Sequence, residues 1–362
     1  YPGNIQTADD VYFNAGGLRR DALVALGMTA PLSETVTAKL KGYYHNNKGA
    51  GLWFTPYLPS PSGVPISVRT TEYGINRAGI FGSIDAELGI NKLTVGAWFE
   101  NNDFDQARRF YGLTSRTTPG VDSLKFPSNP FATQWDFAFN TKTYQYFVED
   151  KIELGDLTIN AGWKGFQVDI EADPRIAGGL ASGKIRSRDW FQPHAGAVYK
   201  VSGSTEVFAG FTQVMRAFTG AATGGPFSTT QVGFDAIRNT LKPEKSDTYE
   251  LGLRYNEGPL NAVLGAYYVN FSNRLLAITT GSGIQGNPSV LQNVGGVRAV
   301  GLEALANLKL GHGLSLFGSY AYNDSTYQDN VVNSAGTVIA QTDGKTTVDS
   351  PKHIARGEIN YD

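Results

Sequence analysis

Two regions of the sequence combine arginine with aromatic side chains, a pairing that suits the binding of an anionic ligand. A guanidinium group forms paired hydrogen bonds with carboxylate or catecholate oxygens, and an aromatic ring stacks on a flat ligand. The structural alternative is that the rings pack loops together while the arginines pair with neighbouring aspartates. The predicted ligand-binding residues, all of which we expect to lie in long loops, are His45, Trp53, Tyr57, Arg108, Arg109, Tyr111 and Trp135.

Other patterns that could carry chemistry are weak. The run Glu100–Gln106 gathers oxygen ligands of the kind that Ca²⁺ takes, but its spacing does not match an EF-hand loop and a solvated loop start also explains it. The spacing G-x-G-x-x-G over residues 281–286 precedes an Asn-Pro pair instead of a helix, which argues against a dinucleotide site. The four histidines lack metal-ligand spacing. We therefore predict no metal site, no cofactor and no catalytic residue.

Composition limits the class of protein. The 362 residues carry 31 Lys+Arg against 33 Asp+Glu, and a net charge of −2 gives no electrostatic basis for binding nucleic acid. The absence of cysteine excludes disulfides and cysteine-ligated metals. Charged residues make up only 18%, whereas aromatics reach 12% and glycines number 43, which suits extended β-structure. No apolar run approaches the roughly 18 residues of a transmembrane helix, and the first ten residues lack the features of a secretory signal.

Alternation of apolar and polar residues recurs along the chain, and the alternating runs come in pairs. In "KIELGDLTINAGWKGF", residues 151–166, two alternating arms flank a Gly-Asp step. About thirteen such strands are predicted, many of them long enough to cross a bilayer obliquely, which takes about 9–11 residues. Short turns join the members of a pair. Long segments rich in Gly, Ser, Thr, Asn and Pro separate the pairs, roughly 46–73, 102–140, 171–186, 217–244, 272–297 and 324–352.

This organisation favours an all-β, antiparallel transmembrane β-barrel with short periplasmic turns and long extracellular loops. So many structureless loops would be unusual in a compact soluble domain, and aromatic residues gather near strand ends as they do in membrane belts. The alternative is a soluble sandwich of two stacked sheets. In a barrel, Leu251 and Leu253 meet lipid while the residues between them line a wet interior. The predicted barrel-lining residues are Glu250, Arg254, Glu303 and Lys309.

Several stretches go further than this alternation. "YQYFVEDKIELGDLTINAGWK" at 144–164 and "FAGFTQVMRAFTG" at 208–220 resemble mid-barrel strands of TonB-dependent outer-membrane receptors of the iron-complex type. "LKPEKSDTYELGLRY" at 241–255, "NVGGVRAVGLEALANLKL" at 293–310 and "SPKHIARGEINYD" at 350–362 follow in the family's order. The region 40–115, with "YYHNNKGAGLW" and "QARRFYGL", resembles the family less specifically.

The resemblance implies a 22-stranded barrel filled by an N-terminal plug, with a short TonB box before the plug. Residues 1–362 would then be a barrel segment, about 13 strands of the 22, and we expect plug, TonB box and C-terminal closing strands to be absent from it. The resemblance further implies the outer membrane of a Gram-negative bacterium, with membrane lipid as a partner. It implies active import, without enzymatic chemistry, of a ferric siderophore or similar bulky nutrient, driven by the TonB complex acting through the missing N-terminal region.

Other functions remain open at this point. A passive porin-like channel would share the barrel, and a receptor of the same family could import vitamin B12 or a saccharide. A soluble β-rich binding module or glycan-active enzyme would need no detergent for extraction. A membrane-embedded enzyme barrel is the weakest alternative, because the sequence shows no pairing of a nucleophile with a base.

Overall fold

A computed structural model describes residues 15–115, 122, 124–279, 289–293, 295–332 and 337–361, and nearly all of its regular structure is β-strand. Thirteen strands belong to one sheet: β1 (Gly16–Pro31), β2 (Val36–Thr55), β3 (Ser67–Leu88), β4 (Asn91–Tyr111), β5 (Ala132–Leu154), β6 (Leu157–Ile176), β7 (Gly183–Lys200), β8 (Thr205–Arg216), β9 (Glu244–Glu257), β10 (Leu260–Ser272), β13 (Val297–Gly311), β14 (Leu314–Tyr327) and β17 (His353–Tyr361). Two small hairpins pair β11 (Leu275–Thr279) with β12 (Ser289–Asn293) and β15 (Val331–Val332) with β16 (Val338–Ala340). A 3₁₀ turn, η2 (Pro226–Ser228), and helix α1 (Gln231–Ile237) follow β8. No helix in the described ranges is long and apolar enough to cross a membrane.

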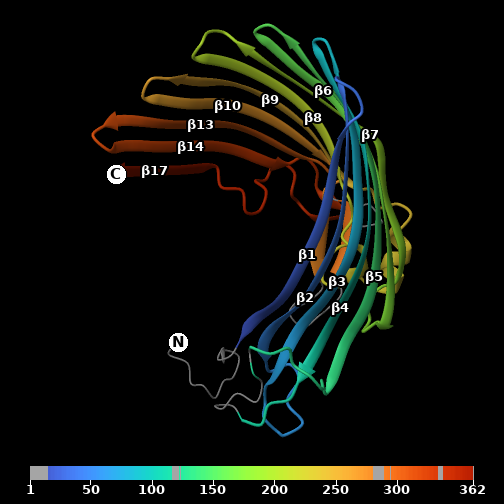
Figure 1. The fold of residues 1–362 in the computed structure, drawn as a ribbon. Helices are drawn as coiled ribbons and strands as arrows, with labels where there is room; N and C mark the ends of the chain where they lie inside the picture. The colour runs from blue at the N-terminus through green and yellow to red at the C-terminus, as the bar shows by residue number, and fades with distance from the viewer. Residues whose placement is uncertain are drawn as a thin grey trace.

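The large sheet is antiparallel, and its strands follow one another in chain order from β1 to β10 and then through β13, β14 and β17. Figure 1 shows it as a single curved and twisted layer. The prediction of about thirteen antiparallel strands is confirmed. The alternative of two stacked sheets is wrong for the described residues, because every long strand lies in the same sheet.

Short turns join the strands in pairs at one end of the sheet, along the upper and left rim in Figure 1. Gly155 lies between β5 and β6, and Gly258 lies between β9 and β10, with φ angles of 64° and 56°. Glycine adopts this left-handed region without steric cost, which is why it occupies these tight turns. The long connections lie at the opposite end, which we call the loop end. The predicted alternation of short and long connections is confirmed.

The predicted boundaries of the first three long connections were wrong, because the strands continue beyond their apolar part. Those expected at 217–244 and 272–297 agree with the observed 217–243 and 273–296 to within one residue at each end. The connections expected at 46–73 and 102–140 lie at 56–66 and 112–131. Apolar alternation stops near Tyr44 and Phe99, but polar side chains then pair across the strands. The amide of Asn46 donates to Asn76 at 2.5 Å, for example. Alternation reports only contact with an apolar environment, so it misses strand ends that lie among polar groups.

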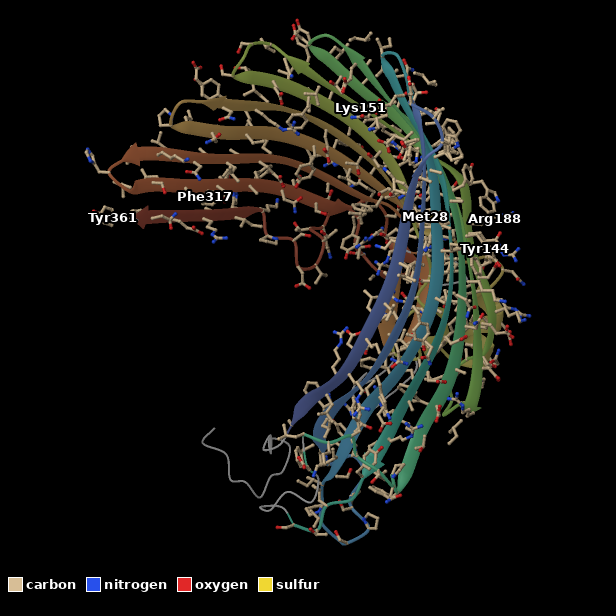
Figure 2. All side chains as sticks on the ribbon, viewed as in Figure 1. Met28, Tyr144, Lys151, Arg188, Phe317 and Tyr361 are labelled. Carbon is tan, nitrogen blue, oxygen red and sulfur yellow. The ribbon has the colours of Figure 1, made fainter. Side chains whose placement is uncertain are left out.

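The two faces of the sheet differ in chemistry over the half nearest the short turns. One face, which we call the outer face, carries Leu26, Leu251 and Leu302, which are 79%, 62% and 53% exposed. Cross-strand register places Leu251 and Leu302 on the same face through Ala266. The opposite, inner face carries polar pairs such as Lys39 with Asp85 at 2.7 Å. Figure 2 shows side chains leaving both faces, and none of the described residues forms a second layer over the apolar one.

Six aromatic rings lie flat over a glycine directly opposite on the neighbouring strand. A Cβ atom added at any of these glycines would fall within 2.5 Å of the ring. The aromatic–glycine pairs are Tyr43–Gly79, Tyr73–Gly49, Phe147–Gly96, Tyr146–Gly165, Phe208–Gly252 and Tyr267–Gly301. The absent side chain of glycine therefore makes room for a ring against the sheet, and this covers backbone that would otherwise be exposed.

Candidate functional site

At the loop end, residues 217–243 pack over the inner face of β5, β6 and β7. Phe137 and Phe139 of β5 are buried against Phe227 and against Phe234 of α1. The rings of Phe139 and Phe227 lie 5.7 Å apart, and those of Phe227 and Phe234 lie 5.1 Å apart. Polar contacts add to this packing, since the amide of Ala222 donates to the side-chain oxygen of β4 residue Gln106 at 2.8 Å. The inner face at the loop end is thus an ordered wall with its own hydrophobic core.

Arg108 of β4 lies on this wall as a buried positive charge. It is 8% exposed, and its guanidinium carbon lies 5.2 Å from the centre of the Trp135 ring. Its Nε atom is buried and has no hydrogen-bond partner among the described residues. Burial, with added repulsion from Arg69, lowers the pKa of Arg108 to about 10. The side chain therefore keeps its positive charge at neutral pH while no carboxylate in the described ranges neutralises it.

A cavity of about 310 Å³ lies on the same wall, two residues along β4 from Arg108. Arg69 of β3, Phe110 of β4, Gln134 of β5 and Tyr57 from the connection after β2 contribute to its lining. Gln134 is the extra residue of a β-bulge, because Arg108 pairs with Trp135 whereas Arg109 pairs with Thr133. A bulge re-aims side chains locally, and here it adds an amide to the cavity. Burial lowers the pKa of Arg69 as well.

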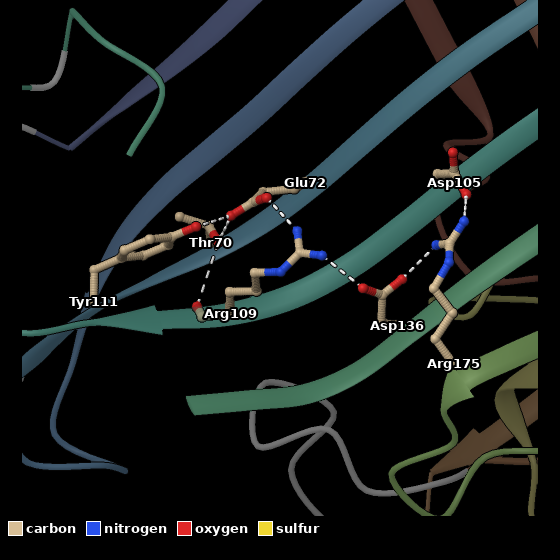
Figure 3. Close-up of polar contacts among 7 residues, drawn as sticks. All are labelled: Thr70, Glu72, Asp105, Arg109, Tyr111, Asp136 and Arg175. Atoms are coloured by element: carbon tan, nitrogen blue, oxygen red, sulfur yellow. Dashed lines mark hydrogen bonds and ion pairs between the residues drawn. The ribbon is translucent and has the colours of Figure 1, made fainter. Parts of the chain in front are cut away.

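The next residue, Arg109, points to the outer face and is paired with two carboxylates. Its Nη1 lies 2.5 Å from Glu72 Oε2, and its Nη2 lies 2.6 Å from Asp136 Oδ2. Burial disfavours the charged form, but the carboxylates of Glu72 and Asp136 outweigh it and raise the pKa of Arg109. Tyr111 donates to Glu72 at 2.5 Å, and Arg175 contacts Asp136 at 2.7 Å. Figure 3 shows the whole network, formed by Thr70, Glu72, Asp105, Arg109, Tyr111, Asp136 and Arg175.

The remaining predicted ligand-binding residues lie on or near the inner face. His45 lies on β2 between two charged side chains, with Nε2 2.5 Å from Asp21 Oδ1, while Arg77 donates to its Nδ1 at 2.9 Å. Trp53 pairs across the strand with Arg69 and is 52% exposed, and Tyr57 is 47% exposed. The structure thus brings Trp53, Tyr57, Arg108 and Trp135 to one wall, and it places Arg109 and Tyr111 on the other face. Of the seven, only Tyr57 lies in a connection. The expectation that all seven lie in loops was wrong, because the strands continue beyond their apolar part and include the other six residues.

A comparison with protein families identifies the fold. The model of the TonB-dependent receptor-like β-barrel matches residues 2–362. The chain belongs to the TonB-dependent receptor family. Members of this family are transporters and receptors, which are not enzymes, and they lie in the outer membrane of Gram-negative bacteria. In this outer-membrane chain, the outer face therefore meets lipid, the inner face lines the lumen, and the loop end is extracellular.

Individual relatives share the fold at low sequence identity. The ferrichrome outer membrane transporter/phage receptor of Escherichia coli (strain K12) is 23% identical over 272 residues, which cover 74% of this chain and 31% of that protein. The unliganded ferric citrate transporter FecA superposes with a TM-score of 0.70 at 21% identity, over 95% of this chain and 47% of FecA. The siderophore receptor PiuA from Acinetobacter baumannii gives 0.69 at 14% identity, over 95% and 52%. The chain therefore spans about half of these solved receptors and about a third of the curated relative.

The four residues predicted to line the barrel all lie on the lumen side of their strands by register: Glu250, Arg254, Glu303 and Lys309. Arg254 stacks over Phe208 with 4.5 Å between its guanidinium carbon and the ring centre. Glu250 and Glu303 border a hollow of about 470 Å³ beside Tyr267. The lumen wall is thus lined by charged and aromatic groups.

Sequence reasoning missed several residues that shape the site. Gln106 acts through a contact with residue 222 and Gln134 through a bulge, and nothing in the local sequence distinguishes them. Phe234 could have been suspected, because it is an apolar residue in a polar segment. The run Glu100–Gln106 is part of β4, and the described residues hold no group of three or more His, Asp or Glu suited to a metal ion. The glycine pattern at 281–286 lies outside the described residues.

Proposed function

We propose that residues 1–362 are the barrel segment of a receptor that binds and imports a ferric siderophore or another iron complex across the outer membrane. The observation that carries this proposal is the extracellular wall of arginine and aromatic side chains on the lumen face, in a barrel of this family. Three relatives are named as a ferrichrome transporter, a ferric citrate transporter and a siderophore receptor, which supports iron complexes as substrates. Transport would be driven by the TonB complex, with no covalent chemistry, so we propose that the receptor is not an enzyme.

Within that function, the residues of the inner wall would contact the ligand directly. Trp53 and Tyr57 supply exposed rings, and Arg108 with Trp135 supplies a cation stacked on an indole. His45 would contribute lower in the lumen. Arg109 and Tyr111 face outward and are paired with carboxylates, so we propose that any part they play in binding is through the position of β4.

Iron uptake by a deletion strain tests this proposal. The strain, carrying the complete receptor on a plasmid, is grown under iron limitation with one iron chelate added at a time, and uptake of radioactive iron is measured. We expect at least one chelate to restore growth in a TonB-dependent manner. Tyr57→Ala should lower uptake at limiting chelate. Tyr199→Ala, which is similarly exposed at 49% but lies near the short turns of the outer face, should not. Iron uptake that is independent of TonB, or growth that no iron chelate restores through this receptor, would contradict the proposal.

A further inference from the structure

Two consecutive arginines of β4 differ in how their charge is balanced. Arg109 contacts two carboxylates on the outer face, whereas Arg108, on the inner face, contacts none in the described part of the chain. The carboxylates nearest in register, Glu72 and Asp136, belong to the outer-face network drawn in Figure 3, so none of the described carboxylates balances the charge of Arg108. A buried charge with no counter-charge is destabilising, so such a group in a binding wall is a candidate for pairing with a ligand.

The surroundings of Arg108 supply what an anion needs. Arg69 adds a second positive charge close enough to repel the first, and an anion near both would relieve that repulsion. Arg69 also lines the 310 Å³ cavity together with Tyr57 and Gln134, whose hydroxyl and amide groups are hydrogen-bond donors. Phe110 forms an apolar side of the same cavity. A cavity of this size holds a carboxylate or catecholate arm of a chelate and not a whole iron complex.

We propose that Arg108, Arg69 and this cavity form an anion-binding site, which makes the receptor select negatively charged iron complexes over neutral ones. The inference rests on the proposed function and names the charge class of its ligand. The resemblance to known receptors leaves the charge of the ligand open. One relative is named for ferrichrome, which is a neutral complex, and another for ferric citrate, which is anionic.

The test compares three probes on the complete receptor purified in detergent: ferric citrate, ferrichrome and iron-free citrate. Binding is followed by tryptophan fluorescence, since Trp135 lies against Arg108. We expect wild type to bind ferric citrate more tightly than ferrichrome. Arg108→Gln should weaken binding of both citrate probes by about 30-fold, or ~2 kcal/mol, and leave ferrichrome unchanged. The same variant should raise the unfolding temperature, because it removes an unbalanced buried charge. Arg175→Gln, on the outer face, is the matched control. It should leave the preference for ferric citrate over ferrichrome unchanged, and it should not raise the unfolding temperature.

The outcomes separate this inference from the proposed function. Citrate binding that depends on Arg108, without binding of any iron complex, supports the anion site and contradicts iron uptake. Binding of iron complexes that does not depend on Arg108, or a preference of wild type for ferrichrome, overturns the anion site. The absence of Arg108-dependent binding for both citrate probes overturns it as well. If Arg108→Gln fails to fold, Arg69→Gln must reproduce the loss of citrate binding, and unchanged binding in that variant refutes the proposal.

Discussion

Gly301→Ala is expected to destabilise the barrel, although alanine is normally the better residue in a strand. A Cβ atom at Gly301 would lie 2.3 Å from the ring carbon Cζ of Tyr267, which is directly opposite on β10. The ring would have to move, and with it the hydrogen bond from its hydroxyl to Asn323 at 3.0 Å. Overpacking costs ~1–3 kcal/mol and the lost hydrogen bond ~1 kcal/mol, against a gain of ~0.5–1 kcal/mol from replacing glycine. The net loss is ~2 kcal/mol.

The matched control is Gly318→Ala on β14, where an added Cβ meets nothing within 4 Å. This variant should be as stable as wild type or slightly more stable. The assay is the midpoint of urea unfolding of the complete receptor in detergent, followed by tryptophan fluorescence. In the double variant Gly301→Ala/Tyr267→Ala the clash disappears, so the two changes should be clearly non-additive. Equal midpoints for Gly301→Ala and Gly318→Ala would refute the idea that the rings require glycine beneath them.

Three further changes test other parts of the structure. Leu302→Lys on the lipid face should lower the free energy of unfolding by ~2–4 kcal/mol in the same assay, whereas Ser319→Lys on the lumen face should have little effect. Phe234→Ala should cost ~3–5 kcal/mol locally and accelerate hydrogen exchange over residues 217–243 while the strands stay protected; uniform acceleration would contradict this. Asp136→Asn removes a carboxylate that two arginines share and should cost ~2 kcal/mol at the loop ends of β4 to β6, measured by hydrogen exchange. Glu171→Gln, in an exposed pair, is the control and should cost under ~0.5 kcal/mol.

The sequence predicted the membrane-facing half of the fold because a single physical cause shapes it. Lipid on one side and water on the other force strict alternation, so residues such as Leu251 and Glu250 reveal both the strand and its two faces. The tight turns were also predictable from the sequence, since glycine is favoured at positions such as Gly155 that need a left-handed backbone. The ends of the strands at the extracellular side could not be predicted from the sequence. There both faces meet polar or protein surroundings, and the pairing of Asn46 with Asn76 leaves no periodic signal.

The types of residue in the candidate site were also predictable, but their partners were not. Arginine and aromatic side chains near the strand ends pointed to a binding wall, and Arg108 and Trp135 do lie together. The cover over that wall comes from residues 217–243, which are more than 100 residues further along the chain than Gln106, the residue that they contact. Local sequence patterns carry no information about contacts at that separation, so the hydrophobic core around Phe234 could not be inferred.

Bulges decide the chemistry of neighbouring side chains here, and they are invisible in the sequence. A regular ladder would have paired Arg109 with Gln134. The bulge instead leaves Gln134 outside the ladder to line the cavity near Arg108. A second shift between Asp136 and Phe137 skips Arg175 in the pairing with β6, and this skipped residue is the one that reaches Asp136. The first bulge thus places the amide of Gln134 at the cavity on the lumen face, and the second places the guanidinium of Arg175 beside Asp136 on the outer face. Because Asp136 is held on the outer face, Arg108 lacks a carboxylate partner among the described residues, and this is the basis of the anion site proposed above.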